Sequence, residues 1–174
     1  EGHDVQIADA VQAYLQADIQ GDACWVSLPR EAWPRNADWS SFRRPVVRLK
    51  KALYGHPDAG TYWEKHCDEQ VRKAGFEPLH EAWPSVYYNK ASQMMLVVYV
   101  DDFKLAGPRA ELKGTWESLK KYVRMEPPTP LGLYLGCVQA CSQETLASGH
   151  EVRVITYDME KHLDQTVQKY LEIA

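Results

Sequence analysis

The apolar positions of the chain form two patterns, short runs typical of strands and longer stretches with helical spacing. Pro127-Pro128-Thr129-Pro130 interrupts them as a stiff connector, because helices and central strands both reject proline. Strands are predicted for the apolar and β-branched runs at residues 5–8, 24–28, 46–50, 86–89, 93–100, 103–106, 133–138 and 152–157.

Helical spacing is clearest in two long segments. One begins near Asp58 and ends before Gly75, and its apolar residues recur at intervals of four, four and three. The other follows the strand predicted at residues 103–106. A shorter helix is predicted within residues 11–18, and Asp158 can cap a last helix. The apolar faces are Trp63, Cys67, Val71 and Ala74 in the first long helix, Leu112, Trp116, Leu119 and Val123 in the second, and Met159, Leu163, Val167 and Tyr170 in the last.

The order of these elements indicates the fold class. Strands are interrupted by two long helices, and a tight hairpin lies at the centre of the chain. An antiparallel sheet can cover the apolar stripes of helices that pack against it. We therefore expect an α+β fold, an antiparallel sheet with helices on one face.

Composition excludes several classes of protein. The 174 residues are 45% hydrophobic and 25% charged, with a formal charge of −4. These values do not fit a disordered acidic tail, a collagen-like fibre or a disulfide scaffold. They also lack the basic balance usual in nucleic-acid-binding domains. The longest apolar run, residues 94–100, is too short to span a bilayer, so we expect no membrane role.

The four cysteines do not favour a metal site. Cys137 and Cys141, with His150 beyond them, resemble a zinc knuckle only faintly, because the spacing is wrong and a fourth ligand is missing. The simpler interpretation is reduced thiols in an intracellular protein.

The chain begins without Met and ends inside a predicted helix, so we expect it to be a piece of a longer protein.

The chemistry-bearing feature is the pair Asp101-Asp102 between two apolar strands. Aspartate is depleted in strands, so both residues are predicted to occupy a hairpin turn. One interpretation is that they form the turn and have no chemical role. Two-residue hairpins usually recruit glycine or asparagine, however, and adjacent carboxylates repel. This favours a counter-ion, for which a divalent cation with oxygen ligands is the natural choice.

Tyr99-Val100-Asp101-Asp102 resembles the YxDD motif of reverse transcriptases. Four further blocks occur in the order found in Copia-type LTR retrotransposon polymerases, and the resemblance runs from about residue 5 to 138. The blocks are residues 9–16, which resemble "DVxxAFLxG", residues 49–55 with Trp63, which resemble "LKKALYG…W", residues 84–88, which resemble "DPSVYY", and residues 134–136, which resemble "FLG".

The resemblance implies an RNA-directed DNA polymerase that uses two Mg²⁺ ions, for which Mn²⁺ can substitute. Asp9 and Asp101 would bridge both ions, Asp102 would support them, and the backbone carbonyl of Ala10 would add a ligand. A primer 3′-hydroxyl would then attack the α-phosphate of the incoming nucleotide.

The same resemblance assigns nucleotide contacts to Tyr14, Tyr99 and Gly55. Tyr14 would lie under the sugar and exclude a 2′-hydroxyl; the alternative is a core aromatic of a short helix. After Gly55 the family commonly has an apolar residue, Lys and Gln, whereas this chain has His56-Pro57-Asp58. That departure puts the contacts of the loop in question.

Basic residues concentrate in one block that contains no acid. Its charges can neutralise nucleic-acid phosphates, or they can simply protect a solvated strand edge. The residues expected to contact nucleic acid are Arg43, Arg44, Arg48, Lys50 and Lys51, together with Trp63.

We therefore expect residues 1–157 to be a reverse transcriptase palm, with the fingers largely missing, and residues 158–174 to begin the thumb. The partners would be an RNA and DNA template–primer, deoxynucleotides and the other Pol polyprotein domains, namely fingers, thumb, RNase H and integrase. The expected location is cytoplasmic virus-like particles, with the nucleus as an alternative. A catalytically inactive nucleic-acid-binding palm and a decayed retroelement remnant are the rival interpretations.

Overall fold

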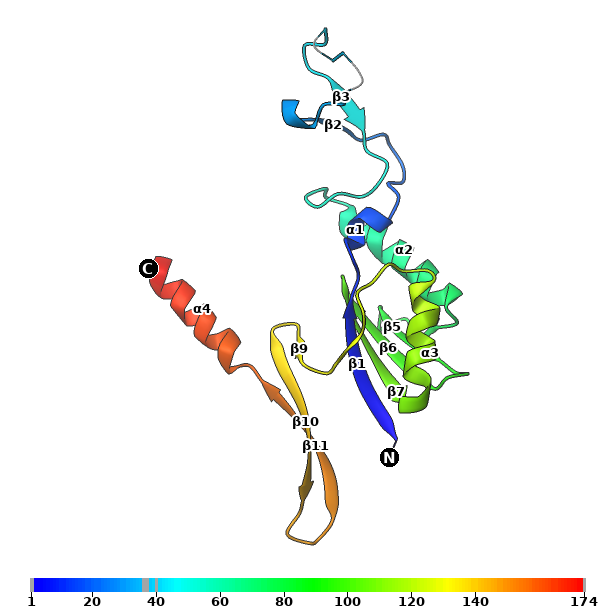
Figure 1. Cartoon of the computed structure of the whole chain (residues 1–174), viewed down its shortest axis with the longest axis vertical. Coiled ribbons are helices and arrows are strands. Elements are labelled where there is room, and N and C mark those ends of the chain that lie inside the picture. Colours follow the sequence, from blue (N-terminus) through cyan, green and yellow to red (C-terminus); the bar gives the residue numbers. More distant parts are fainter. Residues whose placement is uncertain (1, 36–37, 40, 174) are drawn as a thin grey trace.

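The computed structural model describes residues 2–35, 38–39 and 41–173. Its centre is an antiparallel sheet in the order β4-β5-β6-β7-β1-β8. Helices α2 (Ala59–Lys73) and α3 (Arg109–Lys120) cover one face of this sheet (Figure 1). The predicted α+β class is confirmed. The strands are β1 (His3–Asp9), β4 (Glu77–Pro78), β5 (Val86–Asn89), β6 (Met94–Tyr99), β7 (Asp102–Pro108) and β8 (Thr129–Pro130).

The main core lies between this sheet and its two helices. Alternate residues of β6 and β7, such as Leu96, Phe103 and Leu105, are buried, as the two-residue period of a half-covered sheet requires. The apolar faces predicted for both long helices are buried in the same cluster. Val123 is buried as well, although α3 ends at Lys120.

The strand predicted over residues 133–138 is divided in the structure. It forms β9 (Leu133–Tyr134) and the start of β10 (Cys137–Thr145), which pair antiparallel with Cys137 opposite Tyr134. Leu135 and Gly136 between them both have positive φ, at 50° and 76°. Glycine adopts that conformation at little cost, so the chain reverses here and does not continue as a strand.

The C-terminal part of the chain forms a second, smaller sheet and the last helix. Strand β11 (Glu151–Asp158) pairs with β10. Asp158 caps α4 (Glu160–Ile173) as predicted, because its Oδ1 accepts the Glu160 N–H at 2.9 Å. Helix α4 leads away from the six-stranded sheet (Figure 1), and none of its described residues is buried.

The segment between β1 and α2 forms little regular structure. The helix predicted within residues 11–18 is a single turn, α1 (Ala13–Gln16), followed by β2 (Trp25–Ser27), a 3₁₀ turn at Arg30–Ala32 and β3 (Val46–Arg48). Strands β2 and β3 pair only with each other among the described residues, and they extend beyond α1 on the side away from the sheet (Figure 1).

None of the helices in the described part of the chain combines the length and the apolar character needed to cross a membrane.

Candidate active site

The pairing of β1 with β7 gathers three aspartates at one end of the sheet. Asp9 lies directly opposite Asp102, and the Ala10 N–H donates to the Asp101 carbonyl oxygen at 2.7 Å. Residues paired across an antiparallel ladder point to the same face. Their neighbours Ala8 and Phe103 are buried against the helices, so Asp9 and Asp102 point to the opposite, more open face.

Asp9 and Asp101 act electrostatically on Asp102. The pKa of Asp102 is raised, first by its partial burial, then by the negative charges of Asp9 and Asp101, and finally by a hydrogen bond with Asp9. Like charges placed together disfavour ionisation. The ionised cluster is therefore unfavourable by itself, and a cation would relieve its repulsion.

The hairpin turn is displaced by one residue from its predicted position. Tyr99 pairs with Asp102, so Val100 and Asp101 form the turn and Asp102 begins β7. Val100 takes a positive φ of 54°, which is unusual for a β-branched residue. Its carbonyl oxygen accepts the indole N–H of Trp63 at 2.6 Å. Contacts from β1 and α2 therefore hold the turn in a conformation that local sequence preference does not indicate.

The burial of Trp63 speaks against the nucleic-acid contact expected for it. Its side chain is 2% exposed and belongs to the main core, so it has almost no surface to offer a strand. The helical stripe that includes Trp63 packs inward, and the expected contact stays a prediction.

Two tyrosines flank the carboxylates. The rings of Tyr14 and Tyr54 lie 4.6 Å apart, centroid to centroid. The pKa of Tyr54 is raised by burial, then by the negative charge of Asp101 and by Tyr14, which places its hydroxyl in the electrostatic range of the site. Tyr54 did not enter the sequence-based site. The only signal for it was its position directly before Gly55 in the "LKKALYG" block.

The position of Tyr14 is compatible with both roles considered for it. It is half-buried and packs against the main core and a small cluster of Ala17, Ala52 and Ala59. It also lines a cleft of about 340 Å³ together with Tyr99 and Val100. The packing interpretation and the nucleotide-contact interpretation are therefore compatible.

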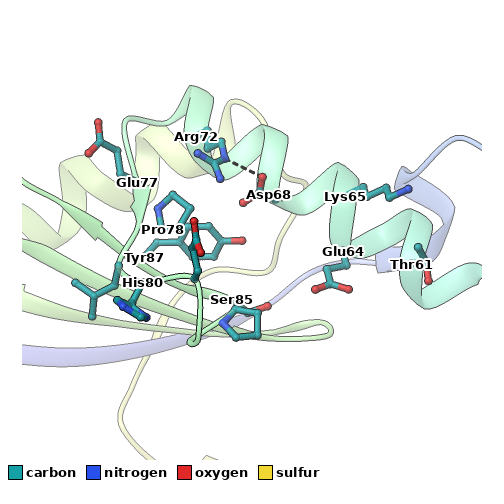
Figure 2. A pocket seen from close by; sticks show the side chains of 13 residues that line it. Thr61, Glu64, Lys65, Asp68, Arg72, Glu77, Pro78, His80, Ser85 and Tyr87 are labelled. Carbon is teal, nitrogen blue, oxygen red and sulfur yellow. Dashed lines mark hydrogen bonds and ion pairs between the residues drawn. The ribbon is translucent and has the colours of Figure 1, made fainter.

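A larger groove of about 1070 Å³ lies between α2 and residues 77–87 (Figure 2). Ser85 and Glu64 border both the groove and the cleft. In the groove Arg72 pairs with Asp68 at 2.7 Å. Four acids, Glu64, Asp68, Glu77 and Glu81, stand there against the cations of Lys65 and Arg72. This balance disfavours a phosphate backbone.

The basic block is exposed throughout, but not all of its charge is free. Lys51 forms an ion pair with Asp18 at 2.8 Å and donates to the Gln16 carbonyl oxygen at 3.0 Å. Arg48 lies on β3, an edge strand. Both interpretations of the block, a phosphate contact and a protected edge, therefore remain consistent with the structure. Its other members, Arg43, Arg44 and Lys50, are exposed as well.

The loop after the basic block is a tight turn. Gly55 has a φ of 90°, which glycine adopts easily. The departure at His56-Pro57-Asp58 leads directly into α2, because the His56 carbonyl oxygen accepts the Ala59 N–H at 3.1 Å. The loop that sets Gly55 beside Tyr54 therefore also begins the helix that carries Trp63.

The donor chemistry of the site suits Mg²⁺, which commonly binds one or two carboxylates plus substrate phosphates. The resemblance implies that three carboxylates together hold the metal, and the geometry of the described residues does not meet that requirement. In the described part of the chain, no group of three or more His, Cys, Asp or Glu side chains has the geometry to hold a metal ion. The four cysteines are free thiols.

A family model for reverse transcriptase (RNA-dependent DNA polymerase) matches residues 1–167. No solved structure matches the chain.

Proposed function

Because the chain belongs to the reverse transcriptase (RNA-dependent DNA polymerase) family, we propose that it is a Copia-type palm that extends a primer by nucleotidyl transfer. Residues 1–157 would form the palm, and residues 158–174 would begin the thumb. Family membership implies a nucleic-acid template–primer and divalent metal.

One observation carries the proposal. The β1–β7 pairing sets Asp9 opposite Asp102, and the Ala10–Asp101 hydrogen bond ties the turn to β1. Residues more than 90 positions apart in the chain thereby present carboxylates to one open face of the sheet. Such a cluster is unfavourable without a cation, and it lies beside a cleft whose lining includes Tyr14 and Tyr99.

The chain's own residues would act mainly by positioning and by charge. Asp9 and Asp101 would hold Mg²⁺, with Asp102 and the Ala10 carbonyl oxygen in support. When bound, the metal supplies charge neutralisation at the attacking and leaving oxygens. The proposed assignment names no protein base, so proton transfer from the primer hydroxyl is left to water or substrate.

Sugar selection is assigned to Tyr14 with Tyr54 behind it. The ring contact at 4.6 Å would limit the movement of Tyr14 when a nucleotide enters. Tyr99 is exposed beside the turn, and Gly55 lets the loop come close to a ligand.

The exposed basic block would contact template or primer phosphates. We place the chain within a Pol polyprotein, with fingers, thumb, RNase H and integrase as partners, in cytoplasmic virus-like particles.

The test is primer extension on an RNA template with Mg²⁺ or Mn²⁺. Asp9→Asn and Asp101→Asn should each lower extension by about 100-fold or more, since metal-assisted charge stabilisation contributes several kcal/mol. Asp164→Asn on α4 is the matched control, because it removes an exposed carboxylate far along the chain. Extension by Asp9→Asn at the level of this control would contradict the proposed site.

A second function has one specific observation in its favour, the incomplete metal geometry in the described residues. A palm that binds RNA without chemistry would show no extension, yet it would retain RNA affinity that falls steeply with salt concentration. Measuring both properties on the same preparation separates the two functions.

A further inference from the structure

We propose that Trp63 is a positioning residue that holds the Val100–Asp101 turn, and with it the two aspartates of the motif, in the geometry needed for divalent metal. This inference rests on the proposed function, because it concerns the same carboxylates. Trp63 would act through the backbone and touch neither nucleotide nor nucleic acid.

The geometry of the contact is specific. The indole N–H of Trp63 donates to the carbonyl oxygen of Val100 at 2.6 Å. That carbonyl belongs to the residue immediately before Asp101. Because the donor is held in a fully packed helix face, the bond fixes the turn relative to α2.

The turn needs such a contact because its backbone is not in a favoured conformation. Val100 has a φ of 54°, and a β-branched residue adopts positive φ only when surrounding structure imposes it. Among the described residues, two hydrogen bonds from outside the hairpin reach the turn, from the Ala10 N–H to the Asp101 carbonyl oxygen and from the Trp63 N–H to the Val100 carbonyl oxygen. Loss of the second of these bonds would leave the turn held from outside the hairpin by the backbone bond from Ala10 to Asp101 alone.

A cleft lies beside the turn and leaves one side of it without packed neighbours. Trp63 and Val100 both line the cleft of about 340 Å³ that also contains Tyr14 and Tyr99. Space next to the turn means that packing alone does not hold it on this side. A hydrogen bond across the wall of the cleft is therefore the main restraint that α2 supplies.

The alternative is that Trp63 only fills the core. Trp116 provides a matched comparison, since it is also 2% exposed and its indole N–H donates to Gln6 Oε1 at 2.9 Å. It lies on α3 and lines a different groove, away from the turn. Trp63→Phe and Trp116→Phe thus each delete one indole donor and keep an aromatic ring.

The experiment makes two measurements. Electron paramagnetic resonance of the free ion reports Mn²⁺ binding, and NMR reports the exchange of the Ala10 amide proton with solvent. Trp63→Phe should weaken Mn²⁺ binding about tenfold, as is typical when a group that orients metal ligands is lost. It should also accelerate exchange of the Ala10 amide beyond the change in Trp116→Phe. Trp116→Phe should leave Mn²⁺ binding within about twofold, although both variants lose thermal stability.

Equal Mn²⁺ affinity and equal Ala10 exchange in the two variants would overturn the positioning role. Asp101→Asn distinguishes this failure from that of the proposed function. If Asp101→Asn leaves Mn²⁺ binding unchanged, the metal assignment fails, and the exchange result still decides the role of Trp63.

A measurement on the unsubstituted protein covers the case in which Trp63→Phe does not fold. The Trp63 indole proton should exchange with solvent as slowly as that of Trp116. Exchange as fast as that of the exposed Trp25 and Trp83 would show that the bond to Val100 does not form, and would also overturn the proposal.

Discussion

Helices α2 and α4 have equally clear apolar stripes but opposite environments. In α2 the stripe is buried, with Val71 fully covered, whereas in α4 Leu163 is 60% exposed and Tyr170 is 69% exposed. Both helices are amphipathic in sequence. The difference lies in the partner, because the six-stranded sheet covers α2 and no described element covers the stripe of α4. An apolar stripe therefore predicts a helix without indicating whether it contributes to the core.

The sheets repeat the contrast. Strand β7 alternates buried and half-buried residues, while β11 is exposed along most of its length. Beyond Met125 the described chain adds only Tyr134 and Gln139 to the buried set. We therefore expect the free energy of unfolding to depend on the segment before residue 126 far more than on the arm formed by β10, β11 and α4.

The largest expected effect compares the two regions directly. Phe103→Ala should lower the free energy of unfolding by about 3–5 kcal/mol, because it leaves a cavity at a fully buried position. Leu163→Ala on α4 should change it by less than about 0.5 kcal/mol. Urea denaturation measures both. A comparable loss in Leu163→Ala would show that the arm is covered in solution.

The carboxylate site is the exception within the stable region. Ionised Asp102 opposes folding, since its pKa is raised by burial and by Asp9 and Asp101. In metal-free buffer near pH 7, Asp102→Asn should raise stability by up to about 1 kcal/mol, or Tm by up to about 2–4 °C, because solvent screens part of the repulsion at this partly exposed side chain.

The pH dependence of this gain follows from the direction of the shift. The folded state holds the proton more tightly than the unfolded chain, whose aspartate has an ordinary pKa of 3.8, so the penalty develops as pH rises above that value. Thermal melts of both proteins should therefore converge below about pH 3.8. A gain that persists at pH 3 would point to a cause other than charge.

A smaller effect is expected at His66 on α2. Burial, followed by the charge of Lys51, lowers its pKa below 6.5, so the unfolded chain binds the proton more readily than the folded state. Stability contributed by neutral His66 is complete above pH 6.5 and declines as pH falls below it, by a fraction of a kcal/mol. His66→Gln should flatten thermal stability across this range, whereas His162→Gln on exposed α4 should not.

The smallest effect is expected for the Lys51–Asp18 ion pair. Both side chains are largely exposed, and exposed pairs contribute about 0.2–1 kcal/mol at low salt. A double-mutant cycle with Lys51→Met and Asp18→Asn should give a coupling near the lower end of this range, reduced further by salt. A coupling above about 1 kcal/mol would mean that the pair is structural and unavailable to nucleic acid.

Local patterning predicted most of the secondary structure. Helical spacing located α2, α3 and α4, and apolar runs located β1 and the β5–β7 strands within a few residues. The failures lie where backbone conformation depends on contacts. Residues 133–138 reverse at Leu135-Gly136, and the motif turn lies at Val100–Asp101 because Tyr99 pairs with Asp102.

The site was only partly predictable for the same reason. Motif resemblance singled out Asp9, Asp101, Asp102 and Tyr14, but their roles stay a proposal. Sequence reasoning assigned Trp63 to nucleic acid although it is buried, and it missed Tyr54, whose ring meets Tyr14 across 40 residues of chain. A residue's direction in a helix and its distant neighbours are properties of packing, which spacing alone does not define.

The sequence by itself determined the periodicities, the family and the presence of an aspartate pair between two apolar strands. Only the tertiary structure decided that Asp9 lies opposite Asp102, that the Trp63 indole reaches the Val100 carbonyl, and that one amphipathic helix is buried while another is exposed. The physical reason is range. Propensity and period act between near neighbours in the chain, whereas strand register, burial and charge clustering depend on surfaces that meet only in the folded molecule.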